Sequence, residues 1–94
     1  MSVDVRIEPA AVQDVPVILK LITELAEYER LSAEVEATEA GLRDSLFGQT
    51  PHAEAIIASV GGEAVGFALW FHSYSTFLAR PGLYLEDLFV RAEW

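Results

Sequence analysis

The hydrophobic pattern of this 94-residue chain changes from helical to extended at Pro51. Before that point, the segment DVPVILKLITELAEYERL (residues 14–31) places apolar residues three or four positions apart. The segment opens with Asp14 at a position suited to an N-cap and with Pro16 in the first turn. After Pro51 the apolar residues fall in extended segments. The pattern therefore indicates a helical part that packs on a sheet.

Two further elements are predicted before the change of pattern. TEAGLRDSLFG (residues 38–48) has the features of a short helix, with Thr38 as its cap and Gly48 at its end. VDVRI, from Val3 to Ile7, alternates apolar and polar residues, which is typical of a strand with one face toward a core. Pro9 ends this strand.

Three more strands are predicted after the change of pattern. HAEAIIASV and EAVGFALWFHSY flank Gly61 and Gly62, and a glycine pair between apolar segments indicates a hairpin. GLYLEDLFV follows a polar and aromatic segment, SYSTFLARPG, that is predicted as a loop able to line a pocket. The expected fold is α+β, in the order strand, helix, helix, and then an antiparallel three-stranded meander.

The net charge of the chain limits its partners. Fifteen acids against six bases give a net charge of −9. Such a field repels phosphate backbones and attracts cations, so we expect no nucleic acid partner and a plausible cationic amine ligand. Solubility alone would explain the acidity equally well.

The residue types also bear on the compartment and on metals. The chain has no cysteine, which fits the reducing cytoplasm. The start, MSVDVRIEP, has no signal-peptide pattern, and the longest apolar run, Ala64 to Phe71, is too short to span a bilayer, so we expect no membrane insertion. His52 and His72 have no partner at metal-ligand spacing, so no metal site is expected.

Two adjacent carboxylates, Glu86 and Asp87, interrupt the apolar run of the last predicted strand. Regular alternation would send one to each face of the sheet, with Tyr84, Leu88 and Val90 on the face of Glu86. A carboxylate among apolar neighbours has its neutral form favoured, which suits it to accept a proton near neutral pH.

Structural interpretations of the same residues remain open. One acid of the pair can bind Arg80 or Arg91 while the other is solvated, and spacing alone favours this interpretation. In the segment AEYER, the pattern alone indicates Tyr28 as an aromatic on the core stripe and Glu29 as a solvated acid.

The segments LAEYE, GFALWFHSYSTF and LYLEDLFV, in this order and spacing, resemble the N-terminal part of the GCN5-related N-acetyltransferase superfamily. The likeness is to its diamine acetyltransferase branch, which includes spermidine/spermine and thialysine N-acetyltransferases. It runs over nearly the whole chain and implies the strand and helix order derived above. The implied activity is direct transfer of an acetyl group from acetyl-CoA to a small primary amine.

The resemblance also implies roles for individual residues. Glu86 matches the acid that deprotonates the amine, and Asp87 is left in a supporting role. Phe77 matches an aromatic that flanks the substrate channel. The remaining implied contacts are substrate binding by Tyr28 and Glu29, and hydrogen bonds from the backbone of Leu88 and Val90 to the pantetheine arm of acetyl-CoA.

The sequence departs from the family pattern at two places, and these affect the expected substrate and the expected cofactor site. Polyamine-specific members carry an acid where this chain has Ser75, and a tryptophan where it has Phe77, so a thialysine-like or other small primary amine is at least as well matched as a polyamine. The second departure is that VRAEW is not followed by the glycine-rich loop that binds the pyrophosphate of acetyl-CoA.

We therefore expect residues 1–94 to be the N-terminal portion of one acetyltransferase domain, without the pyrophosphate-binding loop and the C-terminal strands, and inactive alone. The alternatives are a non-catalytic truncated domain that self-associates as a homodimer or otherwise, and a small module that binds cationic ligands. An open last strand and a sheet face without helices would favour self-association.

Overall fold

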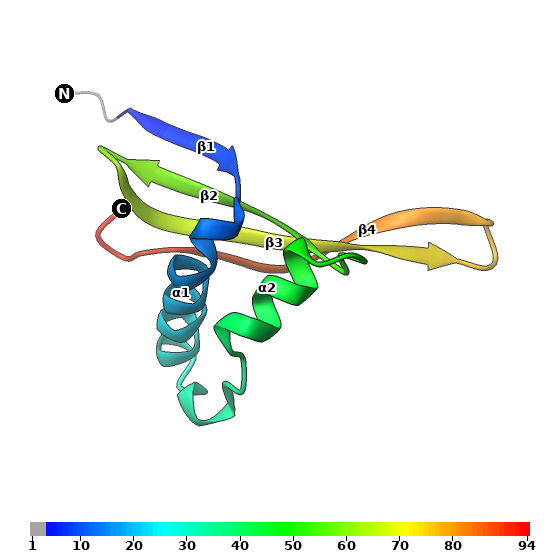
Figure 1. Cartoon of the computed structure of the whole chain (residues 1–94), viewed down its shortest axis with the longest axis horizontal. Coiled ribbons are helices and arrows are strands. Elements are labelled where there is room, and N and C mark those ends of the chain that lie inside the picture. Colours follow the sequence, from blue (N-terminus) through cyan, green and yellow to red (C-terminus); the bar gives the residue numbers. More distant parts are fainter. Residues whose placement is uncertain (1–3) are drawn as a thin grey trace.

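The computed structural model describes residues 4–94, so Val3 of the first predicted strand lies outside the described residues. The chain forms one antiparallel sheet of order β1-β2-β3-β4, with two α-helices on one face (Figure 1). This is the α+β order predicted from the sequence. The elements are β1 (Val5–Pro9), η1 (Val12–Asp14), α1 (Val15–Tyr28), η2 (Ser32–Glu34), α2 (Glu39–Phe47), β2 (Glu54–Val60), β3 (Glu63–Ser75) and β4 (Arg80–Val90).

Helix α1 packs on the sheet through the apolar stripe that the sequence predicted. Val15, Ile18 and Leu21 have no exposed surface. Asp14 occupies the N-cap position, but its Oδ2 accepts a hydrogen bond of 2.7 Å from the N–H of Ala11 and does not cap α1 itself. The carboxylate therefore fixes the single turn of η1 that leads into the helix.

Helix α2 is shorter and covers the other end of the same sheet face (Figure 1). The Oγ1 atom of Thr38 accepts a hydrogen bond of 3.0 Å from the N–H of Gly41, so the predicted cap is confirmed. Among residues 4–94, no helix combines the length and the hydropathy that crossing a bilayer requires. The central core cluster joins both helices to β2 and consists of Ile18, Leu46, Ala55 and Ile57.

The predicted hairpin between β2 and β3 is confirmed, because Gly61 and Gly62 both adopt positive φ angles of 58° and 83°. The predicted loop SYSTFLARPG is wrong in extent. Pairing between β3 and β4 runs from Ser75 opposite Arg80 to Gly66 opposite Val90, and only residues 76–79 form the turn. Pro81 is tolerated in β4 because β4 is an edge strand.

A β-bulge interrupts β4 at the carboxylate pair. Leu69 pairs with Asp87 and Trp70 pairs with Leu85, which leaves Glu86 without a partner. Beyond the bulge, Tyr84 lies on the same face as Asp87, and its ring centroid is 5.0 Å from that of Phe71. The predicted alternation, with Tyr84 on the face of Leu88, is therefore wrong because one extra residue reverses the faces of the strand.

Gly66 allows β3 and β4 to approach closely near the end of β4. A Cβ atom at this position would lie 2.6 Å from the carbonyl oxygen of Phe89. At Gly82, farther along the same strand pair, a Cβ atom would lie 2.9 Å from the Oγ of Ser73, which can rotate away. The same substitution therefore has different consequences at the two positions.

We expect Gly66→Ala to lower the free energy of unfolding by about 1–3 kcal/mol, because the backbone of β4 would have to move. Gly82→Ala is the matched control and should change this free energy little. Urea unfolding followed by circular dichroism measures both variants. Equal effects at the two positions would contradict the close approach at Gly66.

Candidate functional site

The candidate site is a cavity of about 650 Å³ between the C-terminal end of α1 and the last residues of β4. Side chains from both faces of β4 line it, since Phe89 lies on the helix face and Leu88 on the opposite face. The cavity therefore opens along the edge of β4 that does not pair with β3. Its lining residues are Glu24, Leu25, Glu27, Tyr28, Leu88, Phe89, Val90, Arg91, Ala92 and Glu93.

The backbone of Leu88 and Val90 is available at this free edge. The N–H of Arg91 donates a hydrogen bond of 2.8 Å to the carbonyl oxygen of Val65, so it points toward β3. Backbone groups of successive residues in a strand point to opposite edges, and those of Val90 and Leu88 therefore point outward. These residues have the orientation that the predicted contact with acetyl-CoA requires.

Tyr28 lines the cavity at the end of α1, and Glu29 is the next residue in the chain but is not among the lining residues. Tyr28 is 78% exposed, so the interpretation of this residue as part of the core is wrong. Glu29 is exposed and follows the last residue of the helix. Both side chains are accessible to a ligand that enters along β4.

An ion pair fixes the geometry of the cavity. The guanidinium of Arg91 donates two hydrogen bonds of 2.8 Å to the two carboxylate oxygens of Glu24 and one of 3.0 Å to the carbonyl oxygen of Ala64. The Arg91 and Glu24 side chains are only 15% and 28% exposed. The pair therefore ties α1 to β3 and to the end of β4.

The same ion pair shifts both ionisation equilibria. Hydrogen bonds from Arg91 hold the pKa of Glu24 below its usual range, and the bonds to Glu24 raise the pKa of Arg91. Because Arg91 is committed to Glu24, the predicted alternative in which it pairs with Glu86 or Asp87 is wrong. Within residues 4–94, Arg80 also forms no salt bridge with either acid.

Asp87 is the acid of the pair whose ionisation is perturbed. It lies half-buried on the helix face of β4, and burial is the main cause that raises the pKa of its carboxyl group. The negative charges of Glu86 and Glu29 raise this pKa further. The structure thus brings the acid predicted to be supporting into electrostatic contact with one of the predicted substrate-binding residues.

Glu86 is exposed at the bulge of β4. A bulge turns one side chain away from the regular alternation, and such irregularities are frequent beside active sites. Glu86 and Glu29 both raise the pKa of Asp87, so the three acids form one group of interacting carboxylates, although none of them is among the residues that line the cavity. This group suits a ligand with a positive charge.

Phe77 is not brought to this site. It lies in the 76–79 turn at the tip of the β3–β4 hairpin, which projects beyond the helices, and its side chain is fully exposed (Figure 1). The predicted channel aromatic therefore has no contact with the cavity in this structure.

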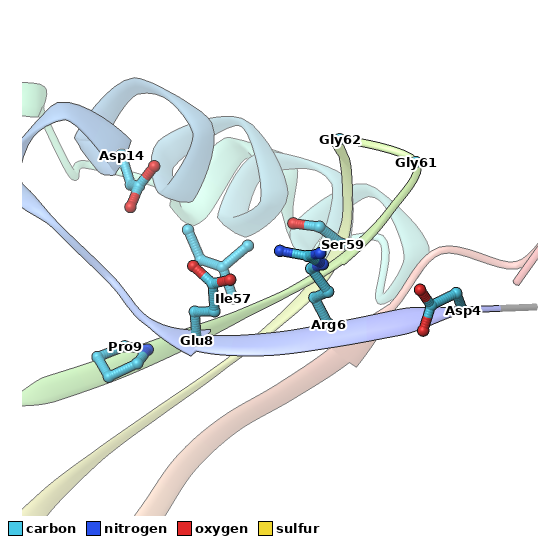
Figure 2. Close-up of a pocket in the computed structure, with 9 residues that line it drawn as sticks. All are labelled: Asp4, Arg6, Glu8, Pro9, Asp14, Ile57, Ser59, Gly61 and Gly62. Carbon is cyan, nitrogen blue, oxygen red and sulfur yellow. The ribbon is translucent and has the colours of Figure 1, made fainter.

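Two other cavities contain none of the predicted site residues. One, of about 570 Å³, lies beside β1, where Arg6 and Glu8 point to the same side as Ile57, and Asp14 also lies on that side (Figure 2). The other, of about 650 Å³, contains His72, whose Nε2 lies 3.1 Å from the Oε2 of Glu54. No residue of β4 lines either of them.

Sequence reasoning missed the roles of Glu24 and Arg91 and understated that of Asp87. Glu24 and Arg91 are 67 positions apart, and no local pattern links them. For Asp87 the sequence contained an indication, because an acid within an apolar strand has its pKa raised if it is buried. Which of the two acids lies on the buried face depends on the register between β3 and β4, which the sequence does not give.

The chain is similar in sequence to known acetyltransferases. No protein-family model matches the chain. It is 41% identical over 98 residues to thialysine N-epsilon-acetyltransferase of Bos taurus, across 96% of this chain and 57% of that protein. It is 36% identical over 92 residues to spermidine/spermine N(1)-acetyltransferase-like protein 1 of Homo sapiens, across 90% of this chain and 13% of that protein. The chain spans about half the length of the thialysine acetyltransferase relatives.

The fold is similar to that of solved acetyltransferases. An aminoglycoside acetyltransferase from an uncultured soil metagenomic sample, in complex with sisomicin, superposes with a TM-score of 0.75 and 20% sequence identity. The superposition covers 96% of this chain and 58% of the other. A possible acetyltransferase from Clostridium difficile 630 gives the same TM-score at 16% identity.

We expect Arg91→Met to lower the free energy of unfolding by about 2 kcal/mol, because Glu24 would stay partly buried without its partner. Arg43→Met is the matched control, since Arg43 is exposed and forms no salt bridge within residues 4–94. Denaturant unfolding measures both. A similar loss in the two variants would show that the ion pair does not stabilise the fold.

We expect Asp87→Asn to raise the free energy of unfolding at pH 7 by on the order of 0.5 kcal/mol, after allowance for solvent screening. The raised pKa of Asp87 means that its ionised form is disfavoured in the folded state, so the wild type loses stability as the pH rises through that value. The gain should vanish near pH 3, where the carboxyl is protonated in both states. Glu36→Gln, which removes a charge from an exposed loop, controls for the change in net charge.

Proposed function

The chain belongs to the GCN5-related N-acetyltransferase superfamily, and we propose that it provides the amine-binding part of an enzyme that acetylates a small primary amine with acetyl-CoA. The observation that carries this proposal is the cavity between the end of α1 and the free edge of β4, with the bulged Glu86 two residues before the lining residue Leu88. The relatives extend beyond the matched part, so the activity is proposed for a protein of their length.

The proposed substrate is a thialysine-like amine. The names of the bovine, porcine and murine relatives specify thialysine, and they are 35–41% identical to this chain. Glu29, Glu86 and Asp87 provide the negative charge that attracts an ammonium group, and Tyr28 provides an exposed aromatic ring beside them. A polyamine is the second candidate, supported by the human relative.

The residues at the free edge fit one part of acetyl-CoA. The backbone groups of Leu88 and Val90 point outward and can hydrogen-bond the amide groups of an extended chain, as a further strand would. When bound, acetyl-CoA supplies the acetyl group as a thioester. Phe77 stays a proposed channel residue that acts only if the hairpin tip contacts the substrate.

The side chains act on the amine. An ammonium group has no free electron pair, so it must lose a proton before it can bond to a carbonyl carbon. Glu86 accepts this proton, directly or through water, because its carboxylate is exposed at the bulge, two residues before Leu88, which lines the cavity. Asp87 holds its own proton more readily than an ordinary aspartate and supports Glu86. We place this activity in the cytoplasm, in keeping with a chain that has no cysteine.

The test compares two proteins. One is a fusion of this chain to the part of the bovine relative that lies outside the matched region, and the other is the 94-residue chain alone. Release of free thiol from acetyl-CoA in the presence of thialysine, spermidine or an unrelated alcohol reports the reaction. We expect thiol release by the fusion with primary amines and none with the alcohol. Absence of transfer to every amine, by a folded fusion, would refute the proposed function.

In the same fusion, we expect Glu86→Gln to lower the turnover rate about 100-fold or more near pH 7, within the range typical of a lost general base. The effect should shrink at high pH, where the amine is already neutral. Glu36→Gln removes an equal charge from an exposed residue that does not line the cavity and should leave the rate unchanged. A rate that does not respond to Glu86→Gln at any pH would remove Glu86 from the mechanism.

Calorimetry separates the enzyme from the module that only binds cations. Binding of both acetyl-CoA and thialysine by the fusion supports the acetyltransferase. Binding of the amine together with no affinity for acetyl-CoA would favour the binding module.

A further inference from the structure

The proposed thialysine-like substrate carries a negative charge as well as positive ones. Thialysine is lysine with a sulfur atom in its side chain, so a carboxylate lies at the end of the molecule opposite the side-chain amine. The interacting acids Glu29, Glu86 and Asp87 attract the amine in its ammonium form but repel this carboxylate. An enzyme that prefers such an amino acid to a diamine therefore needs a cation within reach of these acids.

The chain offers few cations for this role. All six of its bases lie among residues 4–94. Arg91 is committed to Glu24 by two hydrogen bonds, and Lys20 precedes the end of α1 at Tyr28 by about 12 Å along the helix axis. Arg30 is the base that directly follows the end of α1. The other three belong to different elements, namely Arg6 in β1, Arg43 in α2 and Arg80 at the hairpin end of β4.

Arg30 has a backbone conformation that glycine usually provides. Its φ angle is 59°, in the left-handed region. The N–H of Arg30 donates a hydrogen bond of 3.0 Å to the carbonyl oxygen of Glu27, and the N–H of Leu31 donates one of 2.7 Å to that of Ala26. These two bonds make Arg30 the first residue beyond the C-terminal cap of α1, where glycine is the commonest residue. Because a side chain in this conformation costs stability, the backbone gives no reason for an arginine here.

The position of Arg30 places a positive charge beside the acids. Tyr28 lines the cavity, and the charge of the next residue, Glu29, raises the pKa of Asp87. Arg30 follows Glu29 directly, so their Cα atoms are about 3.8 Å apart. The side chain of Arg30 is exposed and forms no salt bridge within residues 4–94. The guanidinium is therefore accessible to the end of a ligand whose amine lies among the acids.

We propose that Arg30 binds the carboxylate of an amino acid substrate and thereby makes the enzyme select such substrates over polyamines. A guanidinium can donate two parallel hydrogen bonds to one carboxylate. The same charge repels the further ammonium groups of a polyamine, which has no carboxylate to offset them. This inference rests on the proposed function, and it adds the residue that distinguishes the two candidate substrates.

The test uses the fusion of this chain to the bovine segment and two substrates that differ only in the carboxylate. These are thialysine and bis(2-aminoethyl) sulfide, which is thialysine without its carboxylate. Arg30→Gln removes the charge and Arg30→Lys keeps it. Arg43→Gln is the matched control, because Arg43 is also exposed and forms no salt bridge within residues 4–94. Thiol release from acetyl-CoA gives kcat/KM for each variant with each substrate.

We expect Arg30→Gln to lower kcat/KM for thialysine about 10- to 100-fold, as for the loss of a hydrogen-bonded ion pair. The value for bis(2-aminoethyl) sulfide should not fall, because that substrate has no carboxylate to lose. Arg30→Lys and Arg43→Gln should both keep the preference for thialysine.

Four outcomes would overturn the inference. In Arg30→Gln, equal losses for the two substrates would show that the arginine acts only on the helix end, through the helix dipole. An unchanged preference in that variant would show that another group binds the carboxylate. Loss of the preference in Arg30→Lys or in Arg43→Gln would assign the effect to the backbone or to the net charge. A fusion that acetylates no amine refutes the proposed function itself, whereas the other three outcomes leave that function intact.

Discussion

The packing of α1 on the sheet is the contact on which the rest of the structure depends. Val15, Ile18 and Leu21 bury their side chains completely, and this burial orients the helix so that its C-terminal end lies beside β4. Hydrophobic burial alone is not directional. The bidentate pair between Arg91 and Glu24 adds direction, because two parallel hydrogen bonds fix the rotation of α1 relative to the strand end.

That arrangement separates the electrostatic roles of the acids near β4. Glu24 is neutralised by Arg91, so it holds the helix and takes no part in the negative field of the site. Asp87 has no such partner and is half-buried, which favours its protonated form. Glu86 stays exposed at the bulge. By binding Glu24, Arg91 makes that carboxylate structural, whereas Glu86 stays exposed to a ligand.

The packing of α1 on the sheet also makes the two faces of the sheet different. The face toward the helices carries the core on β2 and β3 and the charged side chains Arg6 and Glu8 on β1. The opposite face carries Ile7, Ile56 and Val90, and the register places Glu54 and Glu63 on it as well. Because side chains alternate between the two faces of a strand, the face on which α1 packs also determines which side chains lie on the opposite face.

Local patterns predicted the order of the elements, the cap at Thr38 and the glycine turn, since each of these depends on residues close together in the chain. The segment GLYLEDLFV likewise predicted a strand, which is confirmed as part of β4. Pairing across β3 and β4 decided the rest. The bulge at Glu86, the face of Tyr84 and the link between Glu24 and Arg91 depend on register between distant segments, which sequence spacing alone does not encode.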